Sequence, residues 1–152
     1  MIYFIDEDIA QLRPFRAELT FRGYEVTTLP DADSAFSVLV KANPESLQLA
    51  IIDVMLAANP DERASRYQRS NTNNFHKTGL LLLEDLIHFN PTTFPKHAAF
   101  LTHATNNDLI AEIDSVVHKH HIPFLRKRDF ESALAFGERI ETILKEIMKV
   151  KK

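Results

Sequence analysis

The chain has 152 residues, of which 45% are hydrophobic and 26% are charged, the balance of a soluble globular protein rather than a disordered or fibrous one. Its formal net charge of −3 gives no electrostatic support for nucleic acid or an anionic membrane as a partner. The absence of cysteine excludes disulfides, thiolate chemistry and cysteine-based zinc sites.

The amino-terminal segment predicts a buried strand, because residues 2–5 (IYFI) are all β-branched or aromatic. Acidic residues follow at once and no basic segment precedes the strand, so the segment is not a signal peptide. No apolar run approaches the length of a membrane span. We therefore expect a cytoplasmic protein.

Helical spacing of apolar residues over 9–19, ending at Gly23, predicts the first helix. Pro14 fits this helix only if the helix begins near residue 10 or 11, where the missing N–H falls in the first turn. Alternating residues over 24–29 predict a half-buried strand, and Asp31 can cap the helix that follows.

The central strand is predicted over 49–52, an apolar run without alternation that is typical of a strand buried on both faces of a parallel sheet. Residues 57–78 are polar, and Tyr67 and Phe75 are their sizeable apolar anchors. This segment is far longer than the roughly 2–6 residues usual between a strand and a helix, so we interpret it as an insertion loop.

The remaining elements continue the alternation of strand and helix. We predict a helix over 79–89, a strand over 98–101, a helix over 106–119, a strand over 122–125, and a last helix that Asp129 caps. Five strands and five helices predict one α/β domain over residues 1–150. Its expected architecture is a doubly wound, five-stranded parallel sheet in the flavodoxin-like order 2-1-3-4-5, within a three-layer α/β/α fold.

Acidic side chains are expected together at the carboxyl edge of this sheet, where open α/β sheets bind their ligands. The strand order brings Asp6 and Glu7, after the first strand, beside Asp53, after the third. Converging carboxylates repel each other unless a cation compensates, and Mg²⁺ prefers oxygen ligands of this kind. The predicted metal ligands are therefore Asp6, Glu7, Asp53 and a backbone carbonyl just after Asp53, at Met55.

Asp53 is the predicted reacting group. A bound metal would draw the oxygens of a phosphoryl donor towards its carboxylate, whose free oxygen could attack phosphorus. Thr102 and Lys127 end the two adjoining strands and would hold the equatorial oxygens with a hydroxyl and an ammonium. The residues thus predict a Mg²⁺-dependent phosphoacceptor rather than a conventional enzyme.

This arrangement resembles the response-regulator receiver family, the CheY-like phosphoacceptors of two-component signalling. The resemblance covers essentially the whole chain and rests on Asp6-Glu7, Asp53 in IIDVML, Thr102 in FLT, Lys127 in FLRK, and the positions of Gly23, Gly79 and Phe124. It implies that Asp53 accepts phosphate from a phosphohistidine on a sensor histidine kinase or phosphotransfer protein. It also implies that Glu7 and Asp53 hold Mg²⁺ directly, that Asp6 helps through water, and that Thr102 and Phe124 move together as a switch.

Four features depart from the family pattern. Glu7 stands where a second aspartate is commoner, and His103 stands where a small residue is usual, so its bulk could shield the phosphoryl group. Arg128 replaces a proline, which removes the reason to expect a cis peptide bond after Lys127. The insertion at 57–78 has no counterpart in ordinary receivers, and we hypothesise that it helps to select the partner.

Two functions remain open from the sequence. No residues are left for an attached output domain, so a receiver of this length is expected to signal through a separate output protein. The alternative is a receiver-like interaction module that works without phosphorylation, which His103, Arg128 and the insertion favour.

The histidines at 118–121 fit cations at a helix carboxyl end better than a metal site. The choice between monomer and homodimer is also open.

Overall fold

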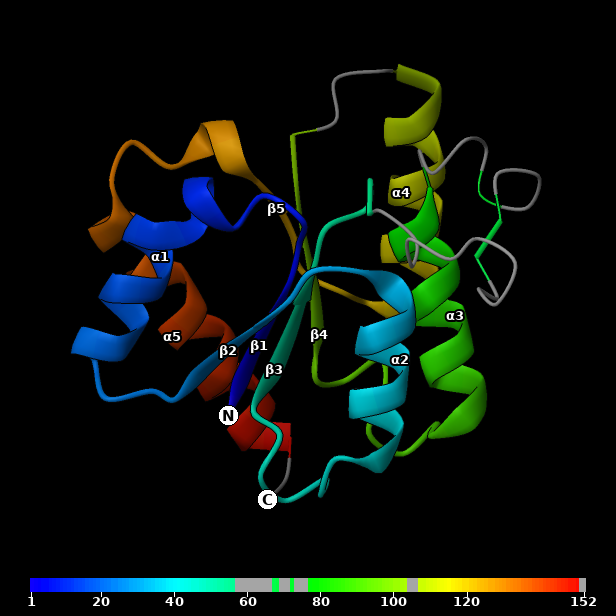
Figure 1. Cartoon of the computed structure of the whole chain (residues 1–152), viewed down its shortest axis with the longest axis horizontal. Coiled ribbons are helices and arrows are strands. Elements are labelled where there is room, and N and C mark those ends of the chain that lie inside the picture. Colours follow the sequence, from blue (N-terminus) through cyan, green and yellow to red (C-terminus); the bar gives the residue numbers. More distant parts are fainter. Residues whose placement is uncertain (57–66, 69–71, 73–76, 104–106, 151–152) are drawn as a thin grey trace.

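The sheet has the predicted order. The structure is a computed structural model that describes residues 1–56, 67, 68, 72, 77–103 and 107–150 (Figure 1). Its five strands pair in parallel in the order β2-β1-β3-β4-β5, which confirms the flavodoxin-like arrangement. The strands are β1 (Ile2–Ile5), β2 (Val26–Leu29), β3 (Leu49–Ile52), β4 (Ala98–Thr102) and β5 (Phe124–Arg126).

Helices cover both faces of the sheet, so the fold has three layers. In Figure 1, α1 and α5 lie on one side of the strands and α2, α3 and α4 lie on the other. The helices are α1 (Ile9–Phe21), α2 (Ala32–Lys41), α3 (Thr78–Phe89), α4 (Asn107–His120) and α5 (Ala133–Val150). Within the described residues, no helix combines the length and the apolar character that crossing a membrane requires.

Two apolar clusters form the core, one on each face of the sheet. Ile52 and Phe100 face the cluster that α2, α3 and α4 cover, whereas Ile51 and Leu101 face the cluster under α1 and α5. Consecutive strand residues point to opposite faces, which explains why β3 is apolar at every position and buried throughout. The central strands are thereby fixed in register, and the residues that follow them are fixed at the carboxyl edge.

The start of α1 differs from the prediction. The helix begins at Ile9 behind Asp8, whose side chain accepts a hydrogen bond from the Gln11 N–H at 3.3 Å. Pro14 is therefore the sixth helical residue. The prediction that the helix begins near residue 10 or 11, with Pro14 in its first turn, was wrong. The Pro14 ring removes the N–H that would bond to the Ala10 carbonyl, but both residues are exposed and water can take the place of the missing donor.

The start of α5 also differs, because Asp129 does not cap it. Residues 127–129 form one 3₁₀ turn, and α5 begins after Ser132, whose hydroxyl oxygen accepts a hydrogen bond from the N–H of Ala135 at 3.2 Å. The physical reason is tertiary. Phe130 stays extended and places its ring edge-on to Phe136, with 5.3 Å between the ring centroids, so the helix cannot start there.

Other boundaries move by one or two residues. β2 begins at Val26 rather than residue 24, and β5 spans 124–126 rather than 122–125. Most of the insertion at 57–78, including Phe75, lies outside the described residues. Its other predicted anchor, Tyr67, is buried in the core and donates a hydrogen bond from its hydroxyl to Asp85 Oδ2 at 3.0 Å. Tyr67 thus connects its own part of the chain to α3.

Candidate functional site

Four polar residues from four strands meet at the carboxyl edge of the sheet. Asp6 follows β1, Asp53 follows β3, Thr102 ends β4 and Lys127 follows β5. The backbone N–H of Asp53 still bonds to the Ile5 carbonyl at 2.9 Å, so the parallel pairing extends to the acidic residue. The edge therefore holds these side chains on a rigid scaffold rather than on free loops.

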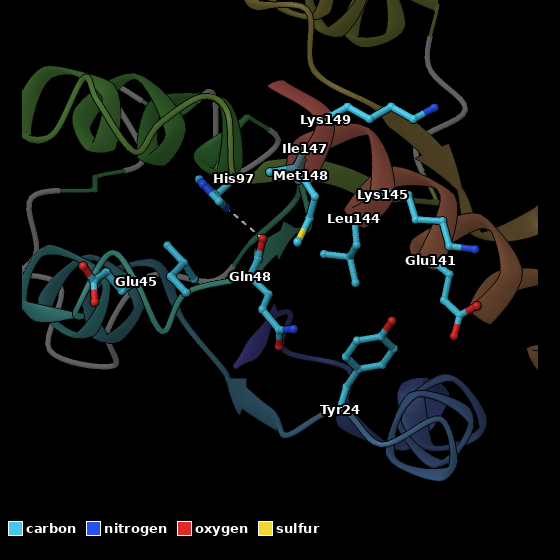
Figure 2. Close-up of a pocket in the computed structure, with 11 residues that line it drawn as sticks. Tyr24, Glu45, Gln48, His97, Glu141, Leu144, Lys145, Ile147, Met148 and Lys149 are labelled. Atoms are coloured by element: carbon cyan, nitrogen blue, oxygen red, sulfur yellow. Dashed lines mark hydrogen bonds between the residues drawn. The ribbon is translucent and has the colours of Figure 1, made fainter. Parts of the chain in front are cut away.

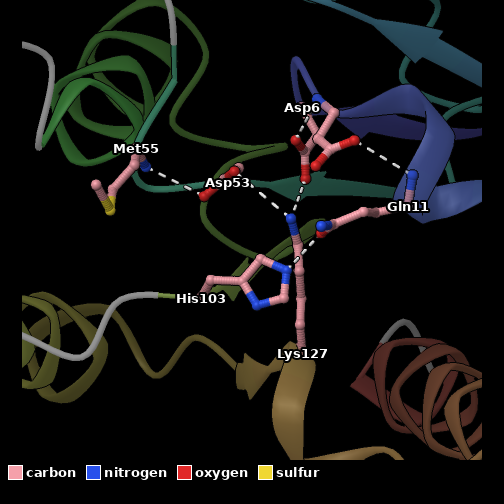
Figure 3. Close-up of polar contacts among 7 residues, drawn as sticks. Asp6, Gln11, Asp53, Met55, His103 and Lys127 are labelled. Atoms are coloured by element: carbon pink, nitrogen blue, oxygen red, sulfur yellow. Dashed lines mark hydrogen bonds and ion pairs between the residues drawn. The ribbon is translucent and has the colours of Figure 1, made fainter.

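A single ammonium group serves two carboxylates in this site. Lys127 Nζ lies 2.6 Å from Asp6 Oδ2 and 3.7 Å from Asp53 Oδ2 (Figure 3). The relative exposure of Asp6, Asp53 and Lys127 is 2%, 8% and 7%, so water screens these charges poorly. The closer pairing of Lys127 with Asp6 leaves the charge on Asp53 only partly compensated.

The carboxylate of Asp53 is held in a defined orientation. Its Oδ1 accepts a hydrogen bond from the Met55 N–H at 3.1 Å, its Oδ2 faces Lys127, and the Thr102 hydroxyl also donates to it. Burial, and after it the charge of Asp6, raises the pKa of Asp53 to about 6, against the opposing effects of Lys127 and the two hydrogen bonds. The site thus carries more negative charge than its own cation neutralises.

Gly79 fixes the chain that returns from the insertion to this site. Its N–H bonds to the Val54 carbonyl at 2.8 Å, and a Cβ at this position would overlap the Asp53 carbonyl oxygen and lie 2.7 Å from the Val54 Cα. Only glycine allows such an approach. The first turn of α3 therefore packs directly on the backbone that carries Asp53.

Asp6 and Asp53 are the acids that the structure brings together. Glu7 has an exposed side chain, in contrast to the buried pair. Among the described residues, no three histidine or acidic side chains converge in a way that could hold a metal ion. Two buried carboxylates with excess negative charge nevertheless fit a hard divalent cation, since Mg²⁺ often uses one or two carboxylates and keeps several waters.

The remaining predicted residues lie outside the buried cluster of Asp6, Asp53 and Lys127. Phe124 is half-buried, and the Arg126 guanidinium carbon lies 5.4 Å from the centroid of its ring. Arg128 is exposed, and in the described part of the chain the one cis peptide bond precedes Pro95, so the bond after Lys127 is trans. The side chain of Met55 is 37% exposed, beside the carboxylate that its N–H binds.

Sequence reasoning missed Gln11. Its Oε1 lies 2.7 Å from His103 Nε2, so a side chain on α1 meets the residue directly after Thr102 (Figure 3). The two residues are 92 positions apart, and no local pattern could indicate the contact. In the histidine-rich end of α4, His120 Nε2 lies 3.0 Å from Glu84 Oε1 on α3.

A cavity of about 620 Å³ lies at the opposite, amino edge of the sheet (Figure 2). Its lining combines apolar and charged side chains of α5 with residues that precede the strands. The apolar members are Tyr24, Leu47, Leu144, Ile147 and Met148, and the polar ones are Glu45, Gln48, His97, Glu141, Lys145 and Lys149. Because β4 separates the two edges, this cavity is not part of the acidic site.

The comparisons with known proteins identify the fold. No family model and no curated protein matches the sequence. A CheY-like response regulator receiver domain protein from Methanospirillum hungatei JF-1 is 20% identical, with a TM-score of 0.67 over 97% of this chain and 95% of that one. A response regulator receiver domain protein from Clostridium thermocellum is 19% identical, with a TM-score of 0.65 over 98% and 97% of the two chains.

A third solved structure is similar at lower identity. It is a response regulator protein from Burkholderia pseudomallei with a phosphorylated aspartic acid, a calcium ion and citrate, and it is 17% identical, with a TM-score of 0.59 over 99% of this chain and 69% of that one. At these identities the likeness concerns the fold. The chain has the fold of CheY-like response-regulator receiver domains.

Proposed function

We propose that this chain is a response-regulator receiver whose Asp53 accepts a phosphoryl group. The observation that carries the proposal is the buried pair of Asp6 and Asp53, which shares the Lys127 ammonium at the carboxyl edge of the sheet. The similar Burkholderia protein, with its phosphorylated aspartic acid and calcium ion, gives a precedent for both features in this fold.

The donor in this proposal is a phosphohistidine on a sensor histidine kinase or phosphotransfer protein. An Asp53 carboxylate oxygen forms a bond to phosphorus while the phosphorus–nitrogen bond of the donor breaks, and the electron pair remains on the imidazole nitrogen, which takes a proton from water. With a pKa of about 6, Asp53 is mostly ionised at pH 7 and therefore available as the nucleophile. Lys127 and Thr102, which already face this carboxylate, would bind the phosphoryl oxygens.

Mg²⁺ is part of the same proposal. Asp53 and Asp6 would hold it, with the exposed Glu7 and a backbone carbonyl at Met55 as further candidate ligands. When bound, the ion supplies neutralisation of the negative charge that the phosphoryl group brings into an already acidic site. The signal would then pass to a separate output protein in the cytoplasm, and residues 57–78 are proposed to help select that protein.

A phosphorylation-independent interaction module is the second candidate. The observation that favours it is the exposure of Glu7, because only two of the three predicted carboxylates are buried together. The burial of a charged lysine with two acids argues against it, since desolvating such a cluster costs stability that a docking surface does not need.

Incubation with acetyl phosphate and Mg²⁺, followed by intact-mass measurement, tests the proposal. The wild type should gain one phosphoryl group that is removed by hydroxylamine, as expected for an acyl phosphate, and that does not form in EDTA. Asp53→Asn should gain none. Asp129→Asn is the matched control, because it removes an exposed aspartate close to Lys127 and should leave the uptake unchanged. A wild type without an adduct, with acetyl phosphate and with phosphoramidate as donors, would favour the interaction module.

A further inference from the structure

We infer that the hydrogen bond between His103 and Gln11 is a bridge on the Lys127 side of the acidic site that restricts the access of water to the phosphoryl group on Asp53. This inference rests on the proposed function. The bridge joins the carboxyl end of β4 to the first turns of α1, and Figure 3 shows its two side chains meeting beside Lys127. Both residues are exposed, whereas Asp6, Asp53 and Lys127 are buried.

The position of His103 places the bridge next to the reacting carboxylate. His103 directly follows Thr102, whose hydroxyl donates a hydrogen bond to Asp53. The charges of Lys127, Asp6 and Asp8 all act on the imidazole, so the ring lies close to the acidic site from which phosphate would be lost. The two Asp53 oxygens have different surroundings, and the bridge is on the side of Lys127 and Oδ2 rather than of Met55.

The chemistry of the two side chains defines the bridge. An amide oxygen can only accept, so His103 Nε2 must carry the hydrogen that is donated to Gln11 Oε1. Partial desolvation of the ring, and after it the Lys127 charge, lowers the pKa of His103, which keeps the ring neutral at pH 7. The contact is therefore a neutral hydrogen bond of 2.7 Å, able to break and re-form without a change of charge.

This bridge would control a defined step. In hydrolysis, the oxygen of a water molecule bonds to phosphorus, the bond from phosphorus to the Asp53 oxygen breaks, and inorganic phosphate leaves with the proton balance made by solvent. The attacking water must reach phosphorus from outside the buried cluster. A closed bridge removes one side of that approach, so the lifetime of the phosphorylated protein depends on how often the bridge opens.

Decay of the phosphorylated protein, followed by intact mass after removal of the donor, tests the bridge. Gln11→Ala and His103→Ala should each shorten the half-life about 2–10-fold, the population change expected from one net hydrogen bond. The double variant should decay no faster than the faster single one, because either change alone already opens the bridge. His118→Ala, which removes an exposed histidine of α4, is the matched control and should leave the half-life unchanged.

The exchanged variant Gln11→His/His103→Gln restores a donor–acceptor pair across the same gap. Its half-life should therefore be longer than those of Gln11→Ala and His103→Ala, a recovery that a merely structural role of the two residues would not produce. A wild type that takes up no phosphate would refute the proposed function itself. A wild type that is phosphorylated, with the same half-life as Gln11→Ala and His103→Ala, would instead refute the bridge alone.

Discussion

The two edges of the sheet both carry buried or half-buried polar groups, but these groups have different kinds of partner at each edge. At the amino edge, His97 Nδ1 lies 3.0 Å from the Gln48 carbonyl oxygen, and the terminal ammonium of Met1 lies 2.8 Å from both the Ser46 carbonyl and the Gln48 side-chain oxygen. At the carboxyl edge, two carboxylates share one ammonium. The amino edge pairs a cation with neutral acceptors, whereas the carboxyl edge keeps an excess of negative charge.

This difference separates structure from function. Hydrogen bonds between buried groups that match each other add stability and require nothing more. A buried carboxylate whose pKa is raised is instead destabilising when ionised, and such groups are concentrated at functional sites. The amino edge contains the cavity, but the carboxyl edge contains the ionised carboxylate that lowers the stability of the fold.

The largest effect on the contrast between the two edges is expected from Lys127→Met, which removes the cation that Asp6 and Asp53 share. Because two buried carboxylates then face each other without compensation, we expect the free energy of unfolding at pH 7 to fall by about 3–5 kcal/mol. Protonation can replace the lost cation, so the deficit should shrink towards pH 5. Urea denaturation at the two pH values measures it, with the exposed Lys145→Met as control. A loss below about 1 kcal/mol at pH 7 would contradict the assigned pairing.

Asp53→Asn should act in the opposite direction. The pKa of Asp53 is raised from 3.8 to about 6, so the folded protein binds more protons than the unfolded chain between these values, and wild-type stability falls as the pH rises through 6. The amide has no such loss. In EDTA, the variant should therefore be more stable than the wild type by on the order of 2 kcal/mol at pH 7.5, and by almost nothing near pH 4. Thermal melting across this range would reject the assignment if the two curves stayed parallel.

The smallest effect is expected at the amino edge, from His97→Phe. The change keeps a buried ring but removes the partner of the Gln48 carbonyl, at a cost of about 1 kcal/mol. The five residues of β4 separate the two edges by roughly 16 Å. His97→Phe and Lys127→Met should thus be additive to within about 0.5 kcal/mol, and uptake of phosphate by His97→Phe should equal that of the wild type. A larger coupling would show that the edges are not independent.

Local pattern was sufficient for most of the fold and for part of the site. The apolar run at 49–52 indicated a strand buried on both faces. The alternation of strands and helices along the chain indicated a parallel sheet, because parallel neighbours must be joined by crossover connections. The sheet order then placed Asp6 and Asp53 together without any knowledge of side-chain contacts. Glu7 could not be placed in this way, because β1 ends at Ile5 and the chain bends at Glu7, where the alternation of strand side chains no longer applies.

The sequence by itself determined the order of the elements and the edge at which the acids gather, since both follow from hydrophobic periodicity and from the polarity of parallel strands. Only the tertiary structure decided that Lys127 binds Asp6 more closely than Asp53, that Gln11 meets His103, and that Ser132 rather than Asp129 precedes the last helix. The Lys127–Asp6 contact spans 121 positions of the sequence, and the Gln11–His103 contact spans 92. The start of the last helix depends on the packing of Phe130 on Phe136. Contacts of this kind depend on how whole elements pack, which no local pattern encodes.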